Sequence, residues 1–334
     1  MIATSEDTTD VKAIVQDVYG EAGVLRLDEI EMPQPKEGEV LIRVKAAGVD
    51  PGVWHLMTGR PYLVRAMGFG MRAPKFRVRG RDVAGTVEAV GAGVTRFKAG
   101  DEVFGISDGS FAQHVSARED KLERKPASLT LEQAAVVPIS GITALQGIRD
   151  AGKVQQGQKV LIIGAAGGVG SYAVQIAKAL GAEVTGVCST SKADLVRQIG
   201  AEHVIDYTRE DFASSGKTYD MILDTAGRRP LSQLRKALAP KGTLVIVGGE
   251  GGGKILGGFD RQILRAPLLS LLSGQTLRPL VAGESAKDLE AVKELIEAGK
   301  VKPVIDRQYP LDKAPDAVRY LAEGHARGKV VVTV

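Results

Sequence analysis

One stretch of the chain constrains its fold more than any other. Residues 159–180 read KVLIIGAAGGVGSYAVQIAKAL, an apolar run, a glycine cluster and then a helical pattern. The cluster follows the pattern G-x-G-x-x-G with alanine in the first place. In such a turn the missing side chains let the backbone approach a pyrophosphate, and the helix N-terminus offers it unpaired N–H groups. We therefore predict a dinucleotide site; the alternative is a tight strand-to-helix turn without a ligand. The residues expected to line the site are Ala165, Gly167, Gly168, Val169 and Gly170.

The residues after the glycine cluster predict a helix that packs on a sheet through one face. Its apolar residues recur at the spacing of a helical stripe; they are Val169, Tyr172, Ala173, Ile176, Ala177 and Leu180. Four more apolar runs follow at intervals of roughly 20 residues, namely AEVTGVC, AEHVIDY, YDMILDTAG and GTLVIVGG. Helical patterns lie between several of these runs, which indicates βαβ units and a parallel sheet of the α/β class.

The first third of the chain has a different pattern of short strands and frequent turns. GEVLIRVKAAGV and RDVAGTVEAVGAGVTRFKAGDEVFGI place β-branched residues between glycines, which is typical of barrel-like folds. The final GKVVVTV returns to a strand pattern, and we assign it to this first domain. The expected division is a flexible tail at 1–10, a discontinuous first domain at 11–130 and 285–334, and a nucleotide-binding domain at 131–284.

The composition predicts a globular chain without membrane spans. Of 334 residues 44% are apolar, and no run approaches the roughly 18 apolar residues of a span. The single cysteine, Cys188, cannot form an intrachain disulfide, and the start MIATSEDTTD lacks the apolar segment of a secretion signal. We therefore expect a cytoplasmic protein. The net charge of +4 is weak evidence for a nucleic-acid partner, and none is expected.

The residues after AEVTGVC indicate which dinucleotide is bound. Enzymes that use NAD place an acidic residue against the ribose hydroxyls about 20 residues after the glycine cluster. This chain has Ser189, Thr190, Ser191 and Lys192 there. A carboxylate would repel a 2′-phosphate, whereas hydroxyl groups and an ammonium bind one, so we expect NADPH. Asp194 lies too far into the next helix to replace the missing acid. The alternative for Lys192 is an ordinary solvated lysine near a helix start.

Six motifs in a fixed order relate the chain to a known family. They are GEVLIRVKAAGVDP, GRDVAGTVEAVGAGVTRFKAGDEVFG, GSFAQHV, AAVVPISGITALQGI, GAAGGVG and GHARGKVVV. Together they resemble the zinc-independent quinone oxidoreductase branch of the medium-chain dehydrogenase/reductase superfamily, over residues 11–334. The resemblance implies a GroES-like β-barrel domain and a Rossmann domain with a doubly wound parallel sheet. It also implies that a nicotinamide lies in the cleft between them.

The same resemblance assigns further residues and an oligomeric state. Those implied at the nicotinamide are Thr143, Val247, Gly248 and Gly249. Those implied at the 2′-phosphate and adenosine end are Lys192 and Tyr207, with Arg327 expected to assist. A homodimer is also implied, and we place its contact in the apolar stretch 263–281. The alternative for that stretch is a sheet edge packed within one chain.

The related alcohol dehydrogenases carry a catalytic zinc, but this chain lacks the expected ligands. Such a zinc needs three protein ligands such as Cys or His. Asp50 stands where those enzymes have cysteine, Arg81 stands where they have histidine, and no cysteine occurs near 135–150. We therefore expect no metal site. The histidines are scattered without paired ligand spacing: His55, His114, His203 and His325.

Without a metal, the hydride donor supplies most of the chemistry, and reduction of quinones or α,β-unsaturated carbonyls fits this limit. The catalytic candidates lie on the loop DPGVWHLMTGRPY. Asp50 replaces the asparagine that is usual in quinone reductases, and a carboxylate cannot donate a hydrogen bond unless it is protonated. Tyr62 matches the proton donor of related enoyl reductases, with a pocket-wall aromatic as the alternative. The residues expected to line the pocket, or alternatively to pack in the core, are Trp54, Met57, Met67 and Phe69.

Two other functions stay open at this point. One is an NADPH-binding sensor or partner-binding protein with little turnover. The other is a zinc-free alcohol dehydrogenase, which needs a residue that activates an alcohol. The basic stretch MRAPKFRVRGR at 71–81 is either a patch for RNA or anionic substrates or a solvated face beside the cleft.

Overall fold

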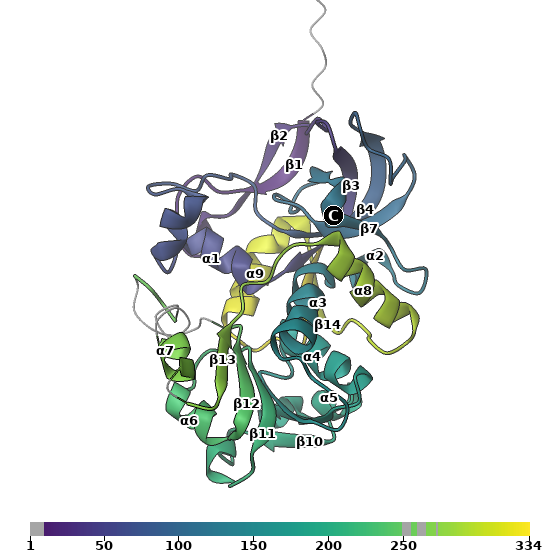
Figure 1. The fold of residues 1–334 in the computed structure, drawn as a ribbon. Coiled ribbons are helices and arrows are strands. Elements are labelled where there is room, and N and C mark those ends of the chain that lie inside the picture. The colour runs from purple at the N-terminus through teal and green to yellow at the C-terminus, as the bar shows by residue number, and fades with distance from the viewer. Residues whose placement is uncertain (1–9, 249–254, 259–264, 272) are drawn as a thin grey trace, which may run out of the picture.

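The computed structural model describes residues 10–248, 255–258, 265–271 and 273–334, and its strands form two large sheets and one hairpin (Figure 1). The parallel sheet occupies the lower half of Figure 1, and most strands of the second, mainly antiparallel sheet lie in the upper half. Helix α3 (Pro138–Leu145) lies at their junction, because it packs against helices α4 and α8 and also touches strands β4 and β5. The two-part α/β fold expected from the sequence is therefore present.

Six parallel strands form the first sheet in the order β10-β9-β8-β11-β12-β13. They are β8 (Lys159–Ile163), β9 (Glu183–Cys188), β10 (His203–Asp206), β11 (Tyr219–Asp224), β12 (Leu238–Ile246) and β13 (Thr276–Pro279). The chain moves outward on one side from β8 to β10 and then returns to β11 on the other side. Such a reversal opens a crevice at the carboxyl ends of the two central strands, where α/β sheets bind their ligands.

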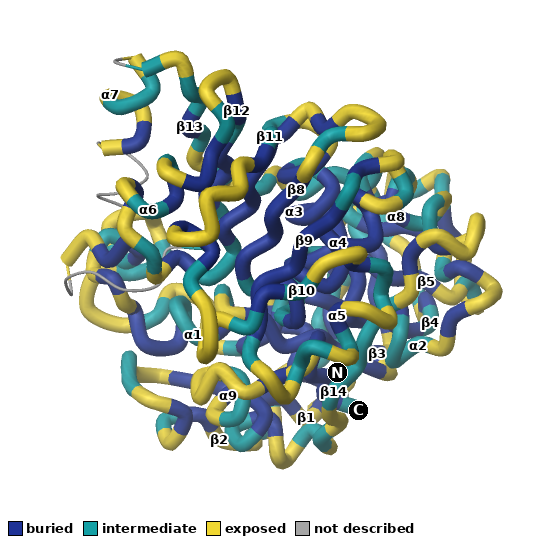
Figure 2. The backbone as a smooth tube through the Cα atoms, turned by 90° about the horizontal axis from the view of Figure 1, so that it is seen from below, coloured by how far each residue is buried: buried dark blue, intermediate teal, exposed yellow. Residues whose placement is uncertain are grey.

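Both faces of this sheet are covered, which explains why its central strands β8 and β11 are mostly apolar. In β8, Val160 and Ile162 belong to one buried cluster, whereas Leu161 and Ile163 belong to another. Figure 2 shows β8, β9, β11 and β12 as largely buried. None of the helices in the described part of the chain has the length and apolar sequence of a bilayer span. Helices associated with this sheet are α4 (Gly168–Ala179), α5 (Ala193–Gln198), α6 (Leu231–Lys236) and α7 (Ala266–Leu271).

Helix α4 is buried on more sides than the predicted stripe requires. Every residue from 170 to 177 is buried, because β8 and β9 contact the helix on one side and α3 on another. The hydroxyl of Tyr172 donates to the carbonyl of Val136, just before α3, over 3.0 Å. The prediction that Leu180 belongs to the buried stripe was wrong. It is 38% exposed, because the helix ends at Ala179 and the chain turns away.

The second sheet has the strand order β14-β15-β3-β4-β5-β7, with β6 also paired to β3. Its strands are β3 (Glu39–Val49), β4 (Asp82–Val90), β5 (Glu102–Ile106), β6 (His114–Arg118), β7 (Leu122–Arg124), β14 (Ile305–Pro310) and β15 (Lys329–Thr333). The hairpin strands are β1 (Asp10–Val15) and β2 (Arg26–Glu31). Helices beside this sheet are α1 (Pro51–Thr58), α2 (Leu131–Ala134), α8 (Ala286–Glu297) and α9 (Ala314–Ala322). Strand β15 runs antiparallel to β3, with Val330 opposite Val49.

A buried ion pair joins the last strand to β4. The Lys329 Nζ lies 3.0 Å from the Asp82 Oδ2, and both side chains are almost completely buried. The other oxygen of Asp82 accepts a hydrogen bond from the backbone N–H of Ile139 in α3 over 2.8 Å. Burial raises the pKa of Asp82, and the Lys329 ammonium opposes that rise. The Asp82 carboxylate therefore links two strands of the second sheet, β4 and β15, to helix α3.

Candidate cofactor and active site

The glycine cluster forms the turn between β8 and α4, at the carboxyl edge of the parallel sheet. Gly164 has a φ of +80°, in the left-handed region that favours glycine. A side chain on Gly170 would place its Cβ only 2.1 Å from the Gly164 carbonyl oxygen, so close packing requires glycine there. A Cβ on Gly167 would have one neighbour within 4 Å, the same oxygen at 3.3 Å. Gly170 thus lets the helix approach the turn, and Gly167 leaves space in front of it.

The N-terminus of α4 has the properties of an anion-binding site. Gly167 is its N-cap residue and supplies no side-chain cap, so the first N–H groups of the helix have no side-chain acceptor. A Cβ on Gly168 would lie 3.1 Å from the Lys329 Cδ and 3.2 Å from the Ser140 Oγ. The backbone of Gly167 and Gly168 therefore carries no side chain, and the side chains of Lys329 and Ser140 lie beside it. These residues fit the pyrophosphate of a dinucleotide.

The segment assigned to the nicotinamide lies beside this turn. Val247 and Gly248 follow β12, and their N–H groups donate to the Asp224 carbonyl over 2.9 and 3.1 Å. A Cβ on Gly248 would come within 2.5 Å of the Thr225 carbonyl oxygen, so the two strand ends are close together. Gly249 lies outside the described residues. The segment therefore borders the carboxyl end of β11.

Thr143 lies on α3 and is buried. Its Oγ1 donates to the Ile139 carbonyl over 2.7 Å, within its own helix. The hydroxyl oxygen keeps its acceptor capacity, which suits the amide N–H₂ of a carboxamide. Ile139 is also the residue whose N–H is held by Asp82, so the buried ion pair fixes the start of the helix that carries Thr143.

A cavity of about 640 Å³ lies where the ends of β9 and β10 meet the C-terminal part of the chain. The sequence assigned five residues to the adenosine end, namely Ser189, Thr190, Lys192, Tyr207 and Arg327, and all of them except Thr190 line this cavity. Its remaining lining residues are Ser191, Asp306, Arg307, Tyr320, Glu323, Gly324 and His325. The fold thus brings together residues that are more than a hundred positions apart in sequence.

Lys192 reaches across this cavity to the segment after α9. Its Nζ donates to the carbonyls of Ala326 at 2.8 Å and Gly324 at 3.3 Å. Burial lowers the pKa of Lys192, an effect that the Asp306 carboxylate opposes and Arg327 reinforces. Neutral carbonyls are weaker partners for an ammonium than a phosphate is. The lysine is therefore placed to exchange them for an anion in the cavity.

Thr190 is not brought to the cavity. Its Oγ1 donates to the Asp206 carboxylate and lies 3.1 Å from the Thr208 hydroxyl. The Thr190 hydroxyl holds the pKa of Asp206 below its usual range, and burial acts in the opposite direction. This hydroxyl thus organises the turn after β10.

The C-terminal wall of the cavity was mostly missed from the sequence. Asp306 accepts hydrogen bonds from the Tyr320 hydroxyl over 2.7 Å and from the Arg327 N–H over 3.0 Å. The guanidinium of Arg307 lies 4.0 Å from the centre of the Tyr320 ring. The motif GHARGKVVV was the signal that pointed to this wall, through Arg327. His325 stands in the same motif and also lines the cavity.

Asp50 has a structural role that its sequence position did not reveal. It is the N-cap of α1, and its Oδ1 accepts the Gly52 N–H over 2.7 Å. A carboxylate cap of this kind stabilises a helix by about 1 kcal/mol. The residue is 3% exposed, and its Oδ2 has no hydrogen-bond partner among the described residues.

The other candidates at the substrate end differ in exposure. Tyr62 is 42% exposed, and the Arg65 guanidinium lies 4.8 Å from the centre of its ring. Trp54 and Phe69 are half-buried, whereas Met67 is exposed. Met57 is completely buried in the cluster beneath α1, so the core alternative holds and the pocket-lining prediction was wrong. The cause is its position on the inner face of α1.

Arg81, at the position of a zinc ligand in related enzymes, is part of an ion-pair network. Its Nη2 binds the Glu284 carboxylate, and its Nε lies 3.5 Å from the Asp108 Oδ1. Lys121 also binds Glu284, over 2.8 Å. Across the described ranges, no group of three or more His, Cys, Asp or Glu side chains is placed to hold a metal ion.

Comparisons with known proteins cover almost the whole chain. Residues 36–127 match the alcohol dehydrogenase GroES-like domain, and residues 199–332 match the family described as zinc-binding dehydrogenase. A chloroplast envelope quinone oxidoreductase homolog from Arabidopsis thaliana is 34% identical over 329 residues, which cover 94% of this chain and 95% of that protein. An NADPH-dependent alkenal/one oxidoreductase, chloroplastic, from the same plant is 33% identical over 341 residues, 97% of this chain and 79% of that protein.

A solved structure agrees with these matches. The quinone oxidoreductase from Coxiella burnetii superposes with a TM-score of 0.85 at 28% identity, covering 98% of this chain and 100% of that chain. Sequence and fold thus agree on both halves of the molecule. The chain belongs to the quinone oxidoreductase type of the medium-chain dehydrogenase/reductase superfamily, and it is an NAD(P)H-dependent oxidoreductase.

Proposed function

We propose that this protein uses NADPH to reduce quinones or α,β-unsaturated carbonyls without a metal ion. The observation that carries the choice of cofactor is the cavity at the ends of β9 and β10. Ser189, Lys192, Tyr207 and Arg327 meet there, and no acidic residue stands at the end of β9 where NAD enzymes hold the ribose. Three cations line this cavity (Lys192, Arg307 and Arg327) against two carboxylates (Asp306 and Glu323). Together with the hydroxyls of Ser189 and Tyr207, this excess of cations favours a 2′-phosphate.

The residues divide the work of binding and reaction. Bound NADPH supplies the hydride. The bare first turn of α4 holds the pyrophosphate, and Thr143 with the Val247–Gly248 segment positions the nicotinamide end. Asp50 fixes the start of α1, which leads into the loop that carries Tyr62. The Tyr62 hydroxyl is the proton donor in this proposal, because a phenol carries an O–H donor, whereas the Asp50 Oδ1 is already the acceptor of the Gly52 N–H.

Turnover with a panel of acceptors tests the function directly. NADPH oxidation is followed by its absorbance with quinones, enones and simple aldehydes as acceptors. The proposal expects consumption of NADPH with quinones or enones. Binding of NADPH without turnover on any acceptor would instead favour a sensor or partner-binding protein. Oxidation of simple alcohols with NADP⁺ would favour an alcohol dehydrogenase.

Removal of metal ions is expected to leave this activity unchanged. The reason is that Arg81 is a cation paired with Glu284, and that within the described ranges no three His, Cys, Asp or Glu side chains are grouped to hold a metal ion. The measurement compares NADPH oxidation before and after dialysis against a strong chelator, together with metal analysis of the protein. Stoichiometric zinc, or activity that is lost on dialysis and restored by zinc, would contradict the proposal.

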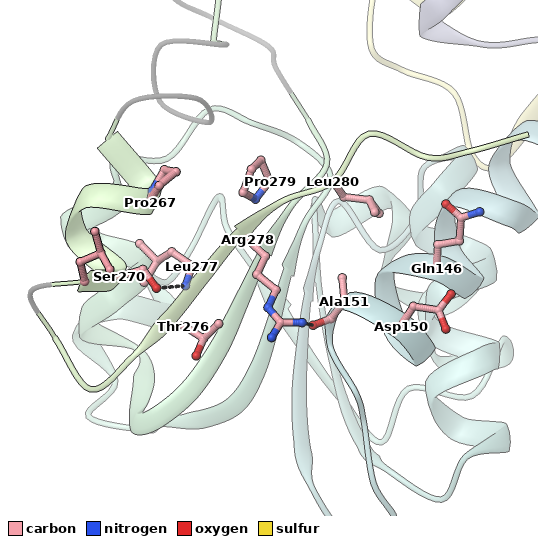
Figure 3. A pocket seen from close by; sticks show the side chains of 11 residues that line it. Gln146, Asp150, Ala151, Pro267, Ser270, Thr276, Leu277, Arg278, Pro279 and Leu280 are labelled. Carbon is pink, nitrogen blue, oxygen red and sulfur yellow. Dashed lines mark hydrogen bonds between the residues drawn. The ribbon is translucent and has the colours of Figure 1, made fainter.

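We also propose a homodimer formed along the free edge of the parallel sheet. Strand β13 pairs with β12 and with no other strand in the described ranges, so one backbone edge is open to a partner strand. Leu271 is 85% exposed, and Leu268 and Val281 are also exposed. A cavity of about 690 Å³ beside this edge is lined by residues of α7 and β13 and by Gln146, Asp150 and Ala151 (Figure 3). Residues 263, 264 and 272 of the predicted contact lie outside the described residues.

Light scattering at micromolar concentration checks the dimer. The wild type is expected at twice the chain mass, and Leu271→Glu is expected to shift it toward the monomer, because a charge would be buried in the contact. Leu27→Glu, at an exposed leucine of the β1–β2 hairpin, is the control and is expected to stay dimeric. A monomeric wild type would contradict the proposal.

A further inference from the structure

The segment between Asp50 and Asp82 has an unusual charge pattern. It contains no acidic residue and seven basic ones: Arg60, Arg65, Arg72, Lys75, Arg77, Arg79 and Arg81. Most of them are engaged by the fold. Arg77 pairs with Asp17 and Asp28, Arg60 with Glu21 and Arg81 with Glu284, while Arg79 is buried.

Two of these cations, Arg72 and Lys75, remain at the surface. Both are exposed, and neither has a carboxylate partner in the described part of the chain. The ammonium of Lys75 lies 5.4 Å from the centre of the Phe76 ring. In the basic stretch 71–81, Arg77 and Arg81 are therefore ion-paired and Arg79 is buried. Arg72 and Lys75 are exposed and can bind an anionic partner.

The same turn exposes large apolar side chains. Met67 is 58% and Met71 66% exposed, and Tyr62 and Phe76 are also exposed. Ile255 and Leu256 adjoin them, because the Leu63 N–H donates to the Ile255 carbonyl over 3.0 Å. Soluble proteins seldom gather exposed apolar residues without a partner for them. We call the surface made by Tyr62, Met67, Met71, Arg72, Lys75, Phe76, Ile255 and Leu256 the turn surface.

The shape of the turn is held by internal contacts. The Tyr19 hydroxyl lies 2.8 Å from the Phe69 carbonyl oxygen and 2.6 Å from that of Gly70, and the Lys75 N–H donates to the Phe69 carbonyl over 2.9 Å. The Arg65 guanidinium stacks 4.2 Å from the Tyr19 ring, and its Nε donates to the Gly59 carbonyl. The exposure of the methionines is thus a feature of a well-bonded turn.

We propose that the turn surface docks on an anionic lipid bilayer. Methionine and aromatic side chains enter the headgroup region of a bilayer, and unpaired arginine and lysine are attracted to anionic lipids. Met67 and Met71 bracket a turn and line neither of the two cavities described above, so they suit insertion into a soft phase. Tyr62 belongs to this surface and the end of α1 adjoins it, because the Arg65 guanidinium donates to the Thr58 carbonyl. An apolar substrate would therefore have a short path from the bilayer to the candidate site. The docking itself does not depend on the proposed reductase activity.

Vesicle binding by the full chain, without cofactor, tests the proposal. We expect the protein to float with vesicles of equal parts phosphatidylcholine and phosphatidylglycerol, and not with phosphatidylcholine alone. A cation near an anionic surface contributes a factor of about five in affinity, so Arg72→Gln with Lys75→Gln should weaken binding about twenty-five-fold. Met67→Ser with Met71→Ser should weaken it roughly tenfold, because the inserted apolar area is lost.

Matched variants elsewhere on the surface provide the control. Lys217→Gln with Lys241→Gln removes two exposed lysines of the nucleotide-binding half, and Leu27→Ser removes an exposed leucine of the hairpin. All variants must keep the melting temperature of the wild type. Absence of binding to the anionic vesicles, including the case in which this surface instead binds a protein, would overturn the proposal. Equal losses in the turn and control variants would overturn it as well.

Discussion

Replacement of Lys329 by methionine is expected to lower the free energy of unfolding by about 3–5 kcal/mol, the usual cost of removing one partner from a buried ion pair. The substitution keeps most of the side-chain volume, so the loss comes from the charge. Asp82 would then be left buried without its cation, holding only the Ile139 N–H. Urea unfolding of the wild type and the variant, followed by circular dichroism, measures the difference.

The loss in Lys329→Met is expected to grow as the pH rises. Burial raises the pKa of Asp82, and the Lys329 ammonium lowers it. Without the ammonium, the pKa of Asp82 in the folded variant should therefore rise further. The folded variant would hold the Asp82 proton at pH values where the unfolded chain has released it, so unfolding is favoured as pH rises above the ordinary aspartate pKa of about 4. Unfolding curves near pH 5 and near pH 8 should therefore differ, with the smaller loss at the lower pH.

A second substitution separates the charge from the packing. Asp82→Asn with Lys329→Met removes both charges and should recover a large part of the lost stability, because no unpaired charge remains. Its unfolding free energy should also lose the extra dependence on pH. A double variant that is as unstable as Lys329→Met at both pH values would show that packing around the lysine, and not its charge, holds these strands together.

The second large effect concerns the cofactor. Lys192→Ala is expected to weaken NADPH binding tenfold to a hundredfold, because a charge-assisted contact to phosphate is worth about 1.5–3 kcal/mol. NADH lacks the 2′-phosphate, so its affinity should change little. Fluorescence titration of both cofactors measures the two dissociation constants. Loss of the contacts from Lys192 to the carbonyls of Gly324 and Ala326 would affect both cofactors equally, so the ratio of affinities isolates the phosphate.

Three further variants sharpen this test. Ser189→Asp should reverse the preference toward NADH, because its carboxylate repels the phosphate and accepts hydrogen bonds from the ribose. Tyr207→Phe should cost less than Lys192→Ala, because the ring remains. Lys217→Ala, at an exposed lysine outside the cavity, is the control and should change neither affinity. Equal binding of NADH and NADPH by the wild type would contradict the assignment of the cavity.

The parallel sheet could be predicted from the sequence because its strands and turns are determined by neighbouring residues in the chain. The residues of β8 after Lys159 alternate between two buried clusters, so all of them must be apolar. The glycines that follow the strand are required by close contacts within a few residues. The C-terminal wall of the cavity, in contrast, depends on contacts between residues that are far apart in the sequence. The cavity is reached by Asp306, Arg307 and Tyr320 because β14 pairs with β15 and β15 pairs with β3. No local pattern in the sequence indicates these pairings.

The individual errors have the same origin. Leu180 was placed by the spacing of apolar residues, and Met57 by its position on the segment that carries the catalytic candidates. Their exposure depends instead on which neighbour covers each helix and on where the helix ends. Thr190 shares its short segment with Lys192, yet its hydroxyl turns to Asp206, which comes from the next strand. Residue type and spacing could therefore locate the segment that lines the cavity, whereas the direction of each side chain depends on its tertiary partners.

The pairing of β3 with β15 imposes an order of events during synthesis. Val49 and Val330 lie opposite each other but are 281 positions apart, the difference of their residue numbers. At roughly 5–20 residues per second, a ribosome needs tens of seconds to deliver β15 after β3 has emerged. All strands of the parallel sheet, from β8 to β13, emerge within that interval. The nascent chain therefore exposes the edge of β3 that β15 will later cover, while its nucleotide-binding half can already fold. During this interval a chaperone or a second nascent chain could pair with the exposed edge of β3.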